Sequence, residues 1–140
     1  MFFKDQYFFL SNFAPCKIKL YNLTFNSVEA AFQAAKTENL SIMQTFCNLM
    51  PLQAKRKGKT IELRSDWEKI KYSVMYFLLK QKFNQQPYKN LLLQTGNIYI
   101  QEDNFWHDTF WGVCNNQGEN RLGELLMIIR KELKEELENK

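Results

Sequence analysis

The sequence predicts one compact α+β domain over residues 1–140, predominantly helical with a few short strands. At 140 residues, the chain is long enough to bury one substantial core. Its composition, 45% hydrophobic and 15% aromatic, differs clearly from that of a disordered chain. Apolar residues recur at helical spacing in several segments, whereas alternation is confined to short stretches. These three observations favour helices packed around a single core.

Short alternating runs predict the strands. Residues 17–25 contain two such runs, which predict a small hairpin or two short strands, and residues 11–15 form a loop before them. Residues 97–101 and 109–114 alternate as well and predict two further short strands.

Helical spacing and capping signals predict the other elements. A helix is expected over residues 26–36, ending near residues 37–39, and a shorter one over 41–50. Gly58 closes a short basic segment at 53–59. Ser65 and Glu68 form a capping box that opens a long helix to about residue 83. Its predicted buried face carries Ile70, Val74, Phe77 and Leu78.

Two helices are predicted in the remaining part of the chain. Pro87 suits the first turn of a short helix, and Gly96 suits its C-terminal stop. The last helix begins near Asn120 and carries an apolar stripe with a charged outer face.

The helix over residues 26–36 also carries polar groups at helical spacing. At about 100° per residue, Glu29, Gln33 and Lys36 fall in one narrow sector beside the apolar stripe. A carboxylate, an amide and an amine in that sector could form the wall of a cleft. With Asn26 as N-cap, Glu29 would instead stand at the third helical position, where it completes a capping box. The residues alone leave both interpretations open.

Cysteine and histidine usage argues against a metal site. The three cysteines, Cys16, Cys47 and Cys114, are widely spaced, and His107 is the only histidine. The sequence therefore predicts no disulfide framework, no metal and no cofactor. A cysteine nucleophile with His107 as its base is an alternative, although the pattern singles out no cysteine.

Several other residues have both a functional and a structural interpretation. Asp108 lies among four aromatic residues that could stack on a flat heterocycle, but it could also form an Asx-turn. Trp67 could cover a pocket or fill the core. The basic residues at 55–59 could hold phosphate or form a solvated segment, in keeping with a net charge of +4. Glu102 could lie near Asp108.

An ordered series of seven short blocks resembles the NADAR family, also called the YbiA-like domain. The blocks are LSNF-P at 10–15, SVEAAFQAAK at 27–36, P-x-x-AK-x-x-G at 51–58, R-x-DW at 64–67, TG at 95–96, D-x-FWG at 108–112 and G-x-N-x-LG-x-LLM-x-IR at 118–130. The family usually has His and Tyr where this chain has Ala30 and Phe32, and its riboflavin-pathway members have Tyr at Ala14. These departures concern substrate identity more than reaction type.

The resemblance implies an N-glycosidase. Such an enzyme hydrolyses the bond between a phosphate-bearing ribose and a nitrogen heterocycle, as in ADP-ribosylated guanine or a ribosylaminopyrimidine phosphate. The implied catalytic residues are Glu29, Asp108 and a lysine, either Lys36 or Lys55. With the polar sector described above, the blocks imply a substrate-binding set of Asn12, Phe13, Gln33, Arg64, Trp67, Gly96, Trp111 and Gly112.

The expected partner is a nucleotide-like small molecule or an ADP-ribosylated nucleic acid. Functional pairing with an ADP-ribosyltransferase is a further expectation, and the oligomeric state is left open. No apolar run approaches 18 residues and no signal-peptide pattern opens the chain, so we expect no membrane partner and a cytoplasmic protein. A non-catalytic reader of ADP-ribose or nucleic acid is the alternative function, and an accessory domain with a decayed pocket is a third.

Overall fold

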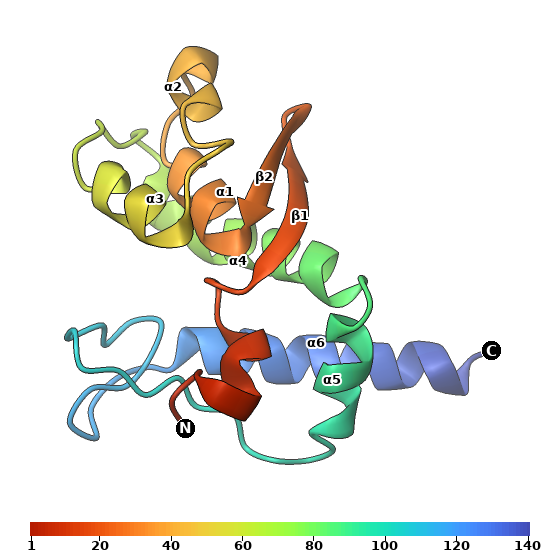
Figure 1. The fold of residues 1–140 in the computed structure, drawn as a ribbon. Helices are drawn as coiled ribbons and strands as arrows, with labels where there is room; N and C mark the ends of the chain where they lie inside the picture. Colours follow the sequence, from red (N-terminus) through yellow and green to blue (C-terminus); the bar gives the residue numbers. More distant parts are fainter. The chain divides into compact units, whose positions relative to one another are not determined.

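The computed structural model describes all 140 residues, and they form two compact units. Unit 1 comprises residues 1–11 and 83–140, and unit 2 comprises residues 12–82. Helices dominate both, and the sheet has only two strands (Figure 1). This confirms the predicted α+β, predominantly helical class. That residues 1–140 form one domain stays a prediction.

Unit 2 begins with the predicted hairpin. Strands β1 (Pro15–Leu20) and β2 (Leu23–Ser27) pair antiparallel. The two residues between them, Tyr21 and Asn22, have φ angles of 50° and 63°. Left-handed φ at both positions is typical of a two-residue hairpin turn whose twist matches that of the strands.

Helix α1 (Val28–Ala34) follows β2 directly. Its N-cap is Ser27, whose Oγ accepts a hydrogen bond from the Ala30 N–H at 3.0 Å. The predicted cap at Asn26 is therefore wrong, because β2 continues through Ser27 and moves the helix start by one residue. The helix also ends earlier than predicted, and Lys36 lies in the turn that follows it.

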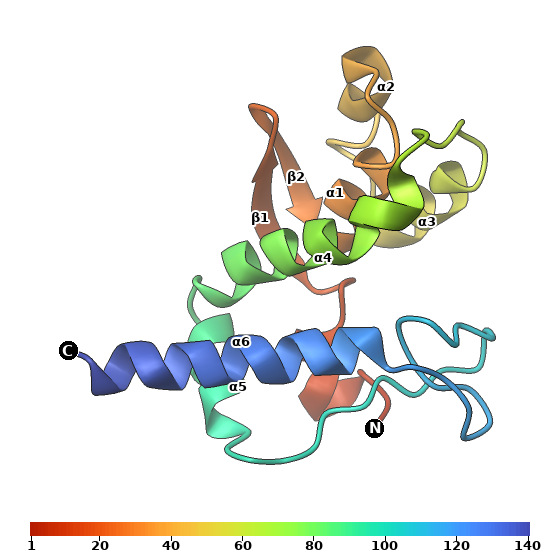
Figure 2. The same ribbon diagram turned by 180° about the vertical axis from the view of Figure 1, so that it is seen from behind.

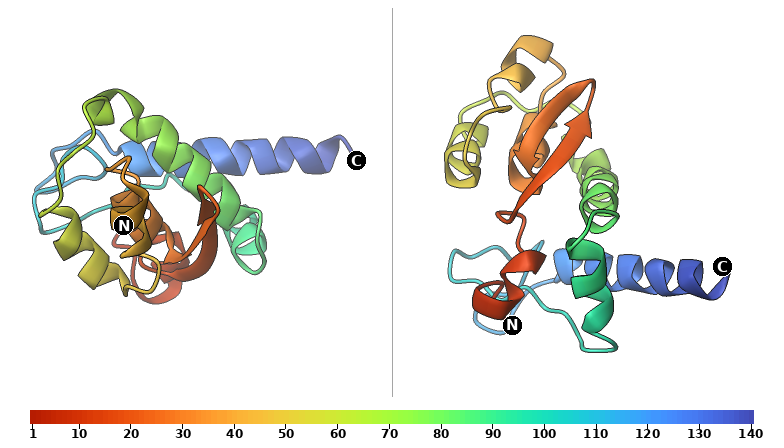
Figure 3. Two further views of the ribbon diagram at one scale, coloured as in Figure 1. Left: turned by 90° about the horizontal axis from the view of Figure 1, so that it is seen from above. Right: turned by 45° about the vertical axis from the view of Figure 1, so that its right-hand side comes forward.

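Three more helices complete unit 2: α2 (Leu40–Gln44), α3 (Pro51–Gly58) and α4 (Trp67–Phe83), the last of which ends on the first residue of the second segment of unit 1. Helix α2 is shorter than the predicted 41–50 helix, and the basic segment at 53–59 is mostly helical. Helix α1 packs against both strands and against α3 (Figure 3). The helix that carries Glu29 and Gln33 is therefore fixed in place by contacts with both strands and with α3.

The predicted start of α4 is wrong, and so is its predicted buried face except for Leu78. Its first residue is Trp67, and Glu68 forms an ion pair with Lys71 at 2.6 Å. Phe77 is 51% exposed, and Ile70 and Val74 are only partly buried. Leu78 belongs to both faces, and the side chains of α4 that are buried are Trp67, Met75, Leu78, Leu79, Lys82 and Phe83. The apolar residues at 70, 74 and 77 instead line a groove described below.

Unit 1 contains a 3₁₀ helix, η1 (Asp5–Leu10), and the helices α5 (Tyr88–Gln94) and α6 (Arg121–Glu138). Helix α5 contacts both η1 and α6, so the N-terminal residues pack with the C-terminal half of the chain (Figure 2). Gly96 has a φ of 64° just after α5, as a helix stop requires. No helix in the molecule combines the length and apolarity needed to cross a membrane.

The predicted strands at 97–101 and 109–114 are wrong. This region forms only isolated bridges, between Asp103 and Val113 and between Cys114 and Gln117. His107, Asn115 and Asn116 all have left-handed φ angles, which interrupt an extended backbone. The alternation in the sequence therefore reflects a loop with buried anchor residues and not a strand pair.

Candidate functional site

Glu29 and Gln33 form a buried hydrogen-bonded pair on one face of α1. Glu29 is 8% exposed and Gln33 is 7% exposed. The Gln33 Nε2 group donates to Glu29 Oε1 at 3.0 Å, as side chains four residues apart on a helix can do. Because Ser27 is the N-cap, Glu29 stands one position before the site where a capping box would need it. Glu29 is therefore not the capping-box residue of α1, and it instead pairs with Gln33 along the helix.

Lys36 brings an amine into the same environment. Burial lowers the pKa of Lys36, and the nearby ammonium groups of Lys59 and Lys71 lower it further, whereas the Glu29 carboxylate acts in the opposite direction. A lysine with a lowered pKa is neutral more often near neutral pH, which is the form that can act as a nucleophile or base. Lys36 is therefore a suitable amine for the reaction.

Asn12 joins the 10–15 block to the start of α1. Its carbonyl oxygen accepts the Glu29 N–H at 3.1 Å, and its Nδ2 faces the Met75 sulfur at 3.7 Å. The Asn12 Oδ1 atom is buried and accepts no hydrogen bond, and the same is true of Gln33 Oε1. A buried acceptor without a donor costs about 1–3 kcal/mol, and a catalytic role is one of the explanations for such a group in a native structure. Phe13, also predicted to bind substrate, follows Asn12 and is partly buried.

Arg64 and Trp67 approach the other end of α1. The Arg64 N–H donates to the Lys36 carbonyl at 2.7 Å, and its guanidinium donates two hydrogen bonds to Asp66. These bonds raise the pKa of Arg64. Trp67 is buried, with its ring 5.0 Å from that of Phe32. The ring therefore fills the core beside the polar face, and stacking of Trp67 on a substrate stays a prediction.

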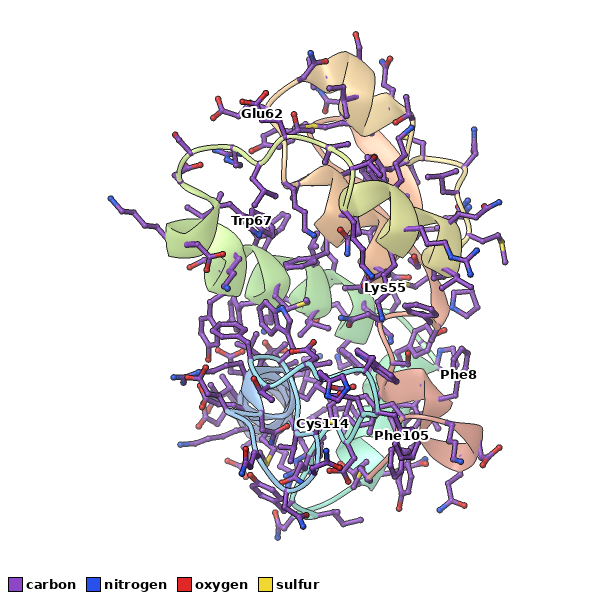
Figure 4. All side chains as sticks on the ribbon, turned by 90° about the vertical axis from the view of Figure 1, so that its left-hand side faces the viewer. Phe8, Lys55, Glu62, Trp67, Phe105 and Cys114 are labelled. Carbon is purple, nitrogen blue, oxygen red and sulfur yellow. The ribbon has the colours of Figure 1, made fainter.

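Lys55 lies on α3, the helix that packs against α1, and it is partly buried. Figure 4 shows its side chain on α3 and the Trp67 side chain at the first turn of α4. Unit 2 thus places six of the predicted residues on or directly beside α1, and Lys55 on a neighbouring helix. The six are Asn12, Glu29, Gln33, Lys36, Arg64 and Trp67.

A cavity of about 450 Å³ in unit 2 lies on a different side of α1. Tyr21, Ala35, Arg64 and Phe77 are among the residues that line it. Only Arg64 of the predicted site residues borders this cavity, and Ala35 stands about 120° around the helix from Glu29. The groove is therefore separate from the face that carries the carboxylate and the amine.

Unit 1 holds Asp108 in a tightly bonded loop. Asp108 Oδ1 accepts hydrogen bonds from the N–H groups of Phe110 and Trp111 at 3.1 and 2.9 Å, which is the geometry of the Asx-turn that sequence reasoning offered as an alternative. The Asn104 side chain bonds both backbone groups of Asp108, donating to its carbonyl and accepting from its N–H. The carboxylate therefore shapes the loop that presents Trp111.

Buried polar groups behind this loop were not predicted, apart from the possibility raised for Glu102. Glu102 is 7% exposed, and a Cβ atom on Gly112 would overlap its Oε2 atom. The Asn120 side chain accepts the Glu102 N–H and donates to the Ile100 carbonyl. Asn104 also donates to Glu102 Oε2 at 3.3 Å, so Glu102 does lie close to the Asp108 loop. The asparagines near Asp108, such as Asn104 and Asn120, were the only feature of the sequence that could have predicted these buried polar contacts.

The structure also shows the contacts of Gly96, a predicted substrate-binding residue, and of Cys114, a candidate nucleophile. The carbonyl of Gly96 accepts a hydrogen bond from Lys134 Nζ, which ties the end of α5 to α6. Cys114 Sγ lies 3.8 Å from His107 Nδ1, which is contact distance for a sulfur atom. The Cys114 residue is only 6% exposed, so a substrate has little access to its thiol. Burial of the thiol therefore argues against a cysteine nucleophile.

Comparison with known proteins assigns the family. The model of the NADAR domain family matches residues 1–134. The chain belongs to the NADAR family. It is 36% identical over 134 residues to the N-glycosidase YbiA of Shigella boydii, covering 92% of this chain and 83% of that protein. It is 33% identical over 136 residues to a riboflavin biosynthesis protein of Vibrio vulnificus, covering 94% of this chain but only 37% of that protein.

A solved structure of a NADAR relative is also similar. The NMR structure of the Escherichia coli protein YbiA matches with a TM-score of 0.86 and 34% sequence identity. The match covers 97% of this chain and 83% of the YbiA chain. The predicted resemblance to NADAR proteins and the predicted fold class are both confirmed.

Proposed function

We propose that this NADAR protein is an N-glycosidase that releases a nitrogen heterocycle from a phosphate-bearing ribose. The observation that carries the proposal is the face of α1, where the buried Glu29–Gln33 pair and the amine of Lys36 share one environment. Relatives along nearly the whole chain are named N-glycosidases, which supports a hydrolase of N-glycosyl bonds. ADP-ribosylated guanine and ribosylaminopyrimidine phosphates are the two substrate types to compare.

Cleavage of an N-glycosidic bond creates positive charge at the ribose C1′ carbon. A carboxylate held beside that carbon stabilises the charge and can activate water, and Glu29 is the group we assign to this role. A positioned acid or base typically contributes about 10²–10⁴-fold to the rate. The lysines around Lys36, including Lys59 and Lys71, supply positive charge suited to a phosphate.

We assign the amine of the reaction to Lys36. The lone pair of the Lys36 nitrogen forms a bond to C1′ while the bond from C1′ to the base nitrogen breaks. The departing base keeps the electron pair of the broken bond and takes up a proton. The nitrogen then loses a proton and forms a C=N bond as the ribose ring opens, with the ring oxygen taking a proton. Water hydrolyses this Schiff base and returns the free lysine. Two observations support Lys36: it lies beside the Glu29–Gln33 pair of α1, and burial lowers its pKa.

Replacement of the carboxylates tests the reaction. We expect Glu29→Gln to stay folded, because the new amide can still accept from Gln33, and to lose at least about 100-fold in base release. Asp108→Asn should also fold, since an amide oxygen can accept the same two N–H groups, and its turnover tests the predicted role of Asp108. Released base is quantified by chromatography from both substrate types.

Glu62→Gln is the matched control, because Glu62 is an exposed carboxylate of the same unit. Turnover at the wild-type rate in Glu29→Gln would refute the assigned chemistry. Tight binding of either substrate by the wild-type protein, with no free base after hours, would favour the alternative of a non-catalytic reader.

Chemical trapping distinguishes the two lysines. Borohydride reduces a Schiff base to a stable amine, so the protein incubated with substrate should gain the mass of the opened ribose moiety. Lys36→Met should abolish this adduct, whereas Lys55→Met should keep it. An adduct that survives in Lys36→Met and maps to residue 55 would reverse the assignment.

A further inference from the structure

The backbone conformation at Gly58 does not require a glycine. It is the last residue of helix α3 and is buried. Its φ angle is not in the left-handed region, whereas those of Gly96 and Gly118 are. Within a helix, glycine is about 1 kcal/mol less favourable than alanine. The reason for a glycine at residue 58 must therefore lie in the atoms that pack against it.

The side chain of Gln33 lies against Gly58. A Cβ atom at residue 58 would overlap Gln33 Oε1, and it would lie 2.6 Å from Gln33 Cδ and 3.2 Å from Gln33 Cβ. The side chain can escape such an overlap only by leaving its place, because Gln33 is itself 7% exposed and enclosed. Helix α3 thus leaves a space at residue 58 that the amide of Gln33 occupies.

The amide that fills this space is oriented by Glu29. Its Nε2 group donates to Glu29 Oε1 at 3.0 Å, and its Oε1 atom faces Gly58 and accepts no hydrogen bond. The reverse orientation would direct the amide oxygen at a carboxylate, which has no proton to donate when ionised. A buried acceptor without a donor disfavours the folded state. The amide thus directs its donor at the Glu29 carboxylate while its own oxygen accepts no hydrogen bond.

We propose that Gln33 and Gly58 are positioning residues for Glu29. Gln33 holds the carboxylate through its Nε2 hydrogen bond, and Gly58 supplies the space in which the amide must lie to make that bond. The proposal rests on the proposed function, in which Glu29 acts at the ribose. It adds that α3, through a residue with no side chain, controls the geometry of a group on α1.

A double-mutant cycle at residues 33 and 58 tests the proposal. Gly58→Ala should lower kcat about tenfold to a hundredfold with a small change in KM, as expected when a hydrogen bond to a charged group is lost. In a Gln33→Ala background, which already lacks the amide, Gly58→Ala should lower kcat no further. Gln33→Met, which keeps the length of the side chain but has no donor, should lower kcat by a similar factor.

Unfolding experiments read the same contact without substrate. Gly58→Ala should lower the denaturant midpoint of the wild-type protein, because the new methyl displaces Gln33. In the Gln33→Ala background it should raise the midpoint, because the methyl fills vacated space and alanine favours the helix.

Leu52→Ala is the control, because Leu52 is 48% exposed on the same helix, and it should leave kcat unchanged. An equal effect of Gly58→Ala in both backgrounds, or full kcat in Gln33→Met, would overturn the proposal. A wild-type protein that releases no base would instead overturn the proposed function, and the opposite midpoint shifts would still report the contact between residues 33 and 58.

Discussion

Lys82 lies near the end of α4 with no exposed surface, although its side chain ends in an amine. Burial lowers the pKa of Lys82 to about 7, and the neighbouring Cys16 acts in the opposite direction. The same burial raises the pKa of the Cys16 thiol. Sequence periodicity placed Phe77 in the core and said nothing of Lys82, because an apolar pattern does not identify a lysine whose neutral form is buried.

This residue should make stability depend on pH. Between pH 7 and 9 the unfolded chain holds a proton on Lys82 that the folded chain largely lacks, so the free energy of unfolding should rise with pH. One such proton contributes up to about 1.4 kcal/mol per pH unit. Lys82→Met should remove most of this slope, which urea titrations at several pH values would measure. Lys36 adds a slope of the same sign, so Lys36→Met is the comparison.

An unchanged slope in Lys82→Met would contradict this account of the buried amine. Cys16 adds a slope of the opposite sign above about pH 8, because its raised pKa keeps the proton on the folded thiol after the unfolded thiol has begun to lose it. The slopes are therefore compared between about pH 7 and 8.

Sequence alone could predict which site residues lie together only where those residues belong to one helix. Glu29, Gln33 and Lys36 could be placed together because helical geometry alone relates residues four and seven apart. The contribution of Gly58 could not be predicted, because it depends on how closely α3 approaches α1. The interpretation of Glu29 as a capping residue failed for a similar reason, since the end of β2 decides which residue caps α1.

Among the elements, alternation predicted one pair of strands correctly and two further strands wrongly. The hairpin formed close to its expected bounds, as did α6. The strands expected at 97–101 and 109–114 rested on the same kind of alternation but did not form. In the folded chain, side chains such as Asn104 and Asn120 bond the backbone of this region and replace the ladder of a sheet.

The loop around Asp108 should therefore depend on Asn104. We expect Asn104→Ala to lower the free energy of unfolding by about 1–3 kcal/mol, because it removes the hydrogen bonds of the Asn104 side chain to the Asp108 backbone and to Glu102. Amide exchange at Asp108, Phe110 and Trp111 should accelerate. Thr109→Ala, an exposed change in the same loop, should have little effect on either measurement. Equal effects of the two substitutions would show that Asn104 does not organise the loop.

At the scale of the whole molecule, family membership came from the order and spacing of short blocks. Single blocks such as D-x-FWG are ambiguous, as the Asx-turn at Asp108 illustrates. Seven blocks in one order over the chain predicted the NADAR family, and the family match over residues 1–134 agrees. Composition and periodicity predicted the α+β class but could not predict how the chain divides, because that depends on contacts between residues far apart in sequence.

The division of the chain has a consequence during its synthesis. Unit 2 is continuous, so its residues are synthesised one after another without interruption. Unit 1 is split, and residues 1–11 have partners that are synthesised only after the whole of unit 2, such as Phe105, on which Phe2 stacks. Until then this aromatic segment lacks those contacts, and transiently exposed apolar segments are prone to aggregate. The synthesis of unit 2 therefore separates residues 1–11 in time from the residues that cover them.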